Sequence, residues 1–164
     1  VLGKEALLGR ERRGLMIFAQ SMIWERVVMS AYHLGAMERQ FNEVLAYSQT
    51  RRQFGSRLLD MPAVSDKLVG MRRNIDTAQA LLYRACWQHD KQQLAAADAS
   101  MLKLHVSSGK VENSLAAVQV FGAAGYMKGG SAELQLRDSI SATIYSGTSE
   151  IQKKLIADAL KPCE

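Results

Sequence analysis

The sequence predicts an all-α protein that folds as an antiparallel helical bundle. Three observations support this prediction: apolar residues recur every three or four positions, prolines occur only at positions 62 and 162, and short polar or glycine-rich segments separate the periodic stretches. Spacings of three and four place residues on one face of a helix, and long stretches without proline favour long helices.

Three long helices are expected, each with one apolar stripe. The first stripe comprises Ile23, Val27, Ser30, Leu34, Met37, Phe41, Val44 and Ser48. The second comprises Val64, Leu68, Met71, Ile75, Ala78 and Leu82. The third comprises Leu94, Ala97, Met101, Leu104, Ser108, Val111, Leu115 and Val118. Helices with one apolar face must bury those faces against each other, which predicts the bundle.

The segments between the stripes predict the turns. Breaks are expected at residues 54–57, 61–62, 89–93 and 122–130. A short helix is expected at 133–138 and a last helix at 151–160. Thr148 or Ser149 can cap that last helix, and Glu150 suits the positive end of its dipole. No segment alternates over a length useful for a strand.

Composition excludes several classes of function. A chain of 164 residues with 48% hydrophobic residues fits one domain with a sizeable core. The net charge of +5 comes without a dense basic stripe, so nucleic-acid binding is not expected. Two distant cysteines and three scattered histidines predict neither a disulfide framework nor a metal site. No apolar run is long enough for a membrane span, and a cytoplasmic location is expected.

Three further segments carry a recognisable pattern. The first is Arg51-Arg52-Gln53-Phe54-Gly55, and the second is QVFGAAGY at residues 119–126. The third is Arg137-Asp138, followed by IYSGTSEIQ at residues 144–152. In this order, and on this helical pattern, the segments resemble the C-terminal domain of acyl-CoA dehydrogenases over essentially the whole chain.

This resemblance implies a four-helix bundle and a flavoenzyme. Residues 1–164 would form the last of three domains, with the family's N-terminal helical domain and central β-domain absent. The implied reaction is α,β-dehydrogenation of an acyl-CoA, in which a carboxylate removes the α proton and FAD accepts a hydride. It also implies a homodimer or homotetramer, because the flavin bridges subunits, and an electron-transfer flavoprotein or oxygen as electron acceptor.

The resemblance also implies a set of flavin-binding residues. Those expected to reach the adenosine-diphosphate part of FAD on a neighbouring subunit are Arg51, Gln53 and Phe54. Those expected to contact the same cofactor from the other subunit are Gln119, Gly122 and Ala123, where Ala123 replaces the second glycine of the family's pair. Thr148 and Glu150 are expected to touch the flavin through the start of the last helix.

The catalytic base departs from the commonest pattern of the family. Ser146 occupies the position where most members carry a catalytic Glu, and a serine is a poor base at neutral pH. A minority of members place the base on the first long helix, and Glu25 of Ile23-Trp24-Glu25-Arg26-Val27 occupies that position. Its apolar neighbours suit a carboxylate that abstracts a proton, so Glu25 is the predicted base. Arg26 is expected to position substrate or base, and Tyr145 to lie beside the acyl site.

A second departure leaves the substrate carrier open. Many relatives have Asp where this chain has Ile23, near the pantetheine arm of CoA. This difference admits a carrier-protein-bound acyl or aminoacyl thioester as an alternative substrate. An alternative of another class is a helical assembly module without catalysis, which Ser146 motivates. The 164-residue chain alone is expected to bind little flavin and to show no turnover.

Overall fold

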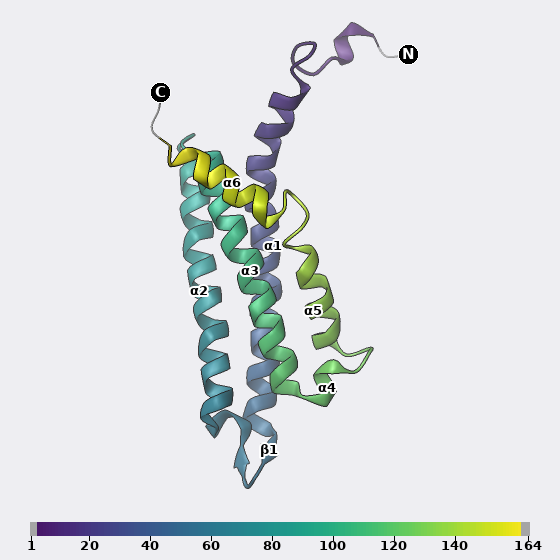
Figure 1. Ribbon diagram of the computed structural model, residues 1–164, viewed down its shortest axis with the longest axis vertical. Helices are drawn as coiled ribbons and strands as arrows, with labels where there is room; N and C mark the ends of the chain where they lie inside the picture. The colour runs from purple at the N-terminus through teal and green to yellow at the C-terminus, as the bar shows by residue number, and fades with distance from the viewer. Residues whose placement is uncertain (1–2, 162–164) are drawn as a thin grey trace.

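The computed structural model describes residues 3–161, and these residues are mostly helical (Figure 1). The elements are η1 (Lys4–Ala6), α1 (Gly14–Thr50), β1 (Arg52–Gln53), β2 (Ser56–Arg57), η2 (Leu58–Asp60), α2 (Pro62–Asp90), α3 (Ala96–Phe121), α4 (Ala123–Tyr126), α5 (Ser131–Ser141) and α6 (Ser149–Ala159). The all-α prediction is therefore confirmed.

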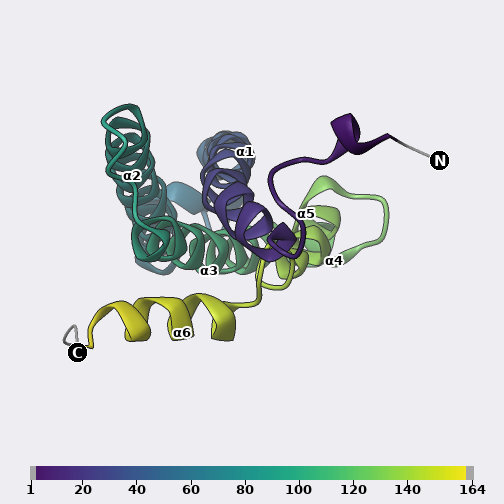
Figure 2. The same ribbon diagram turned by 90° about the horizontal axis from the view of Figure 1, so that it is seen from above.

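The long helices α1, α2 and α3 lie side by side, and α2 runs antiparallel to both α1 and α3 (Figure 1). The shorter α5 packs along α3 as a fourth helix, and α6 crosses one end of the bundle. The view from above shows α3 between α1, α2, α5 and α6 (Figure 2). The helix α3 is therefore the central element, and it contacts the other five α-helices.

Two of the three predicted stripes form the core. Val27 and Met37 of the first stripe share one buried cluster with Ile75 of the second, and Val44 shares another with Met71. Each fully buried side chain of this size stabilises the fold by about 1.5–3 kcal/mol relative to an exposed one. The apolar periodicity of α1 and α2 thus identifies the faces that meet.

The prediction for the third stripe was wrong. Met101, Ser108 and Leu115 are exposed, whereas α3 buries a face that includes Leu102 and Asn113. The buried members of α3 are Ala99, Ser100, Leu102, Lys103, Val106, Ser107, Gly109, Lys110, Asn113, Ser114, Ala117 and Val120. Many of these side chains are polar, and hydrogen bonds satisfy them inside the bundle. Apolarity therefore did not mark the inner face of this central helix.

A small hairpin joins α1 to α2, where no strand was expected. Arg52 pairs with Arg57, and Gln53 pairs with Ser56. Phe54 and Gly55 form its tip with φ angles of 52° and 82°, which is the geometry of a two-residue hairpin turn. Strands of two residues are too short to show alternation, so the sequence pattern did not reveal them.

The boundaries of the last two helices agree with the prediction to within a few residues. The helix α5 covers 131–141 where 133–138 was expected, and α6 covers 149–159 where 151–160 was expected. Thr148 is the N-cap of α6, because its Oγ1 accepts a hydrogen bond from the backbone N–H of Ile151. The capped start of α6 fixes the end of the loop that carries the candidate site.

Candidate active site

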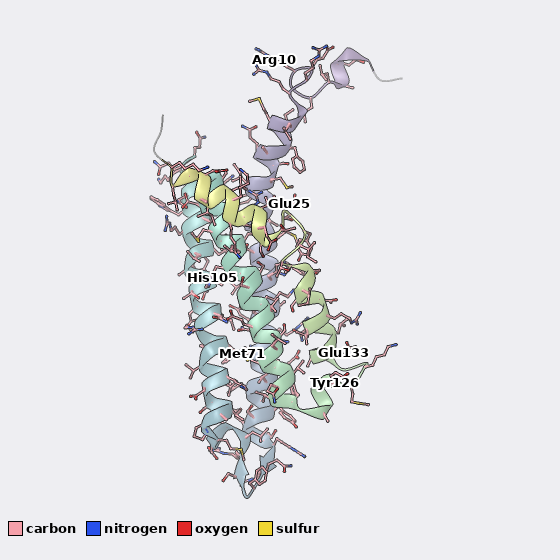
Figure 3. All side chains as sticks on the ribbon, in the orientation of Figure 1. Arg10, Glu25, Met71, His105, Tyr126 and Glu133 are labelled. Carbon is pink, nitrogen blue, oxygen red and sulfur yellow. The ribbon has the colours of Figure 1, made fainter. Side chains whose placement is uncertain are left out.

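Glu25 and Ser146 meet in the structure although they lie far apart in the sequence. Ser146 Oγ donates a hydrogen bond to Glu25 Oε1 at 2.5 Å. Glu25 lies on α1, and Ser146 lies in the loop between α5 and α6 (Figure 3 labels Glu25 near the start of α6). The two positions that the resemblance offers for a catalytic carboxylate therefore converge on one point in space.

The loop around Ser146 has an unusual backbone. Ser146 and Gly147 have φ angles of 55° and 90°. A Cβ at position 147 would lie 2.7 Å from Nε2 of the buried Gln152, so only glycine fits there without displacement. This conformation directs the two backbone carbonyls of the loop into the protein.

Buried donors hold those carbonyls. The carbonyl of Ser146 accepts from Arg26 Nε at 3.4 Å, and that of Gly147 accepts from Lys103 Nζ at 2.8 Å. Gln152 Nε2 donates to both, at 3.1 and 2.8 Å. Arg26 thus contacts the loop that faces Glu25, which fits the expected positioning role. Sequence reasoning did not identify Lys103 or Gln152 as part of the site.

The charge behind the loop is positive. Burial lowers the pKa of Arg26, and the nearby carboxylate of Glu25 opposes that shift. Burial also lowers the pKa of Lys103, as does the charge of Arg26. Arg26 and Lys103 therefore place positive charge behind the Ser146–Gly147 loop.

Tyr145 belongs to a second buried contact beside the first. Its hydroxyl lies within hydrogen-bond distance of Nε2 of His33, and Nδ1 of His33 lies 3.0 Å from Nζ of Lys110. His33 and Lys110 are only 4% and 7% exposed. Sequence reasoning missed both residues. The available signal was the spacing of Lys103, Ser107, Lys110 and Ser114, which places four polar residues on one face of α3.

A cleft of about 480 Å³ lies one turn before Glu25 on α1. Ile23 and Trp24 line it together with residues of the turn between α2 and α3. The rings of Trp24 and His89 stack with their centroids 4.1 Å apart. Ile23 therefore contributes an apolar wall at the position where the resemblance expects an acidic residue.

The residues expected to bind flavin form two groups at opposite ends of the bundle. The groups are Arg51, Gln53, Phe54, Gln119, Gly122 and Ala123 at one end, and Thr148 and Glu150 at the other. At the first end, α1 and α3 are joined by Tyr47 and Phe121, whose ring centroids are 4.8 Å apart. Glu25 and Arg51 are 26 residues apart on α1, which corresponds to about 39 Å. A single chain therefore does not bring the eight residues together.

The chemistry of these groups nevertheless fits a flavin nucleotide. The Phe54 ring is 96% exposed, and the neighbouring Arg51 and Gln53 are also exposed. Gly122 has a φ of 62° and no atom within 4 Å of an added Cβ, so its backbone is open to a ligand. A guanidinium suits a diphosphate, and an aromatic ring suits adenine. The separation of the two groups is compatible with the expectation of a cofactor between subunits.

Comparison with known families gives the decisive observation. Residues 12–161 match the family described as acyl-CoA dehydrogenase, C-terminal domain. The chain belongs to this family. Among residues 3–161 of this acyl-CoA dehydrogenase domain, no group of three or more His, Cys, Asp or Glu side chains is placed to hold a metal ion. None of its described helices is long and apolar enough to cross a membrane.

Individual relatives include enzymes that act on carrier proteins. The chain is 41% identical to the L-prolyl-[peptidyl-carrier protein] dehydrogenase of Pseudomonas fluorescens over 94% of this chain and 40% of that protein. It is 33% identical to the short-chain specific acyl-CoA dehydrogenase of Clostridium acetobutylicum over 93% of this chain and 40% of that protein. The chain thus spans about 40% of the length of these curated relatives.

Solved structures of related enzymes share the fold of this chain. The crystal structure of the prolyl acyl carrier protein oxidase AnaB superposes with a TM-score of 0.94 at 38% identity, covering 98% of this chain and 43% of that one. The structure of PigA with FAD and proline superposes with a TM-score of 0.89 at 37% identity, covering 93% of this chain and 40% of that one.

Proposed function

We propose that the full-length gene product catalyses FAD-dependent α,β-dehydrogenation of an acyl thioester, with Glu25 as the base. The observation that carries this proposal is the contact between Glu25 and Ser146, because it puts a carboxylate beside the position that usually holds the family's base. In this mechanism Glu25 removes the α proton, and Arg26 and Lys103 hold the loop that faces it. When bound, FAD supplies the acceptor for the hydride that leaves Cβ.

The substrate we propose is an aminoacyl thioester on a carrier protein, the alternative that Ile23 raised. Two observations favour it over acyl-CoA. Identity to the prolyl-carrier-protein dehydrogenase is 41%, against 33% for the short-chain acyl-CoA dehydrogenase. Ile23 also gives the cleft that Trp24 and His89 line an apolar wall, in place of the acidic residue that many relatives carry near the CoA arm. Acyl-CoA remains the competing substrate.

We also propose the assembly and partners that the family implies. The separation of the flavin-binding residues into two ends supports a homodimer or homotetramer in which each flavin contacts two subunits. Reoxidation would use an electron-transfer flavoprotein or oxygen; the name of AnaB, an oxidase, is compatible with oxygen. A cytoplasmic location completes the proposal.

Anaerobic mixing of the flavin-loaded full-length protein with thioesters tests the proposed function. We expect a prolyl thioester of a peptidyl carrier protein to bleach the flavin absorbance faster than short acyl-CoA esters. Faster bleaching by CoA esters would favour the acyl-CoA reading. A bound flavin that no thioester bleaches would contradict catalysis and favour the assembly module.

A further inference from the structure

A buried chain of hydrogen bonds joins α3, α1 and the loop that carries Ser146. It runs from Lys110 through His33 to the hydroxyl of Tyr145. No carboxylate of residues 3–161 forms a salt bridge with Lys110; His33 is its hydrogen-bond partner, and the ring of Tyr32 lies 5.8 Å from its Nζ. Keeping an ammonium buried without a carboxylate partner is costly, and the removal of a proton by Glu25 does not require it.

The chemistry of the three groups determines which group donates and which accepts in each hydrogen bond. An ammonium can only donate, so Nδ1 of His33 accepts from Lys110. His33 is therefore neutral, with its hydrogen on Nε2, and this hydrogen is donated to the oxygen of Tyr145. Burial, together with the charges of Lys110 and Lys103, lowers the pKa of His33 to about 4, which agrees with a neutral ring. The phenol ring is thus held by a directional contact at its far end.

The position of that ring relative to the base follows from spacing. Glu25 and His33 are eight residues apart on α1, so they share a face and are separated by about 12 Å along the axis. Their partners, Ser146 and Tyr145, are adjacent in the loop, with Cα atoms about 3.8 Å apart. Tyr145 can reach His33 only if its side chain extends along α1, away from Glu25. The ring centroids of Tyr145 and His33 are 5.7 Å apart, in a stacked arrangement.

We infer that Tyr145, held by His33 and Lys110, closes the acyl site on the side away from the thioester and restricts the substrate to a small acyl group. This inference rests on the proposed function, because it takes Glu25 as the point where Cα of the substrate lies. A long alkyl chain that continued along α1 would displace the Tyr145 ring and lie against the buried ammonium of Lys110. The displaced ring and the apolar contact with the ammonium both disfavour a long alkyl chain, whereas a short or cyclic acyl group avoids them.

The test compares acyl groups of two sizes in the full-length, flavin-loaded protein. Prolyl and octanoyl thioesters of the same carrier protein are mixed anaerobically with the parent, with His33→Ala and with Lys110→Met. The parent should reduce its flavin much faster with the prolyl thioester. Each variant should raise the octanoyl-to-prolyl rate ratio by about ten-fold or more. His105→Ala is the matched control. His105 lies on another face of α3, where it contacts Thr77 of α2, so this substitution should leave the ratio unchanged.

Three results would overturn the inference. A parent that reduces its flavin equally fast with both thioesters has no such restriction. Variants that retain flavin but slow both reactions by the same factor show a structural role only. Nitrogen NMR of the histidine rings provides a readout besides turnover: His33 should be the neutral Nε2–H form in the parent, and a charged or Nδ1–H ring would also overturn the inference. By contrast, a parent that no thioester reduces rejects the proposed function itself, and this inference with it.

Discussion

At the scale of single residues, the site depends on three buried cations that form no salt bridge within residues 3–161. The cations are Arg26, Lys103 and Lys110, and their hydrogen-bond partners are carbonyls, a serine hydroxyl and an imidazole nitrogen. Arg26 and Lys103 keep these partners only while the loop holds its carbonyls in place, and Lys110 depends on His33, which also holds Tyr145 of the loop. The conformation of the loop and the burial of these cations therefore depend on each other.

The pH dependence of stability should report on His33. Its pKa is about 4 in the folded chain against 6.5 as the ordinary value, so the unfolded chain binds a proton first as the pH falls. The contribution of neutral His33 to the free energy of unfolding is fully present above about pH 6.5. It is lost as the pH falls toward 4, with a total on the order of 3 kcal/mol. Urea unfolding of the parent and of His33→Gln from about pH 7 to about pH 4 measures it.

The expected signature is a difference between the parent and His33→Gln that shrinks as the pH falls. His105→Gln is the control, because His105 is less buried and contacts Thr77. A parent–variant difference that stays constant across this range would show that His33 is not held neutral by the fold.

At the scale of elements, the loop between α5 and α6 should tolerate change less than other turns do. Gly147 and Gly55 both have positive φ, but only at Gly147 would a Cβ meet a neighbouring atom closer than 3 Å. We expect Gly55→Ala to cost about 1–2 kcal/mol from backbone strain, and Gly147→Ala to cost more. Urea midpoints of the two variants decide this; equal losses would mean that Gln152 does not clamp the loop.

The inner face of α3 provides a second test at this scale. Asn113 donates to the carbonyl of Met71 and accepts from Asn74, so Asn113→Ala leaves buried groups unpaired. The expected loss in the free energy of unfolding is about 1–3 kcal/mol. Ser108→Ala, on the exposed face first expected to be buried, should change it by less than about 0.5 kcal/mol. A larger loss for Ser108→Ala would restore the original assignment of the face.

The contrast between helices explains what the sequence could and could not predict. On α2 the buried residues are mainly apolar, and on α1 the buried apolar residues recur at helical spacing, so spacing identified faces such as that of Met37 and Met71. On α3 the buried face includes Lys103, Lys110 and Asn113, whose partners come from distant segments. Spacing within one helix carries no information about those partners, which is why Glu25 was found through a motif and His33 was not found.

At the scale of the whole molecule, the two groups of proposed flavin-binding residues are too far apart to serve one cofactor within one chain. Phe54 makes this testable, because its exposed ring contributes little to the stability of the chain itself. Phe54→Ala should leave the unfolding midpoint of the chain nearly unchanged but lower the FAD retained by the full-length protein after gel filtration. Unchanged flavin retention would remove Phe54 from the cofactor site.

The most direct test of Glu25 as the base is anaerobic flavin bleaching in the full-length protein and its Glu25→Gln variant, using the prolyl carrier thioester. We predict that the flavin of the parent is bleached and that the flavin of Glu25→Gln is not, while the variant keeps the parent's oxidised flavin spectrum. The side chain of Gln is close in size to that of Glu, so the packing around Ser146 is retained and only the base is lost. Equal flavin bleaching in both proteins would contradict the assignment of Glu25 as the base, because the α proton would then be removed by another group.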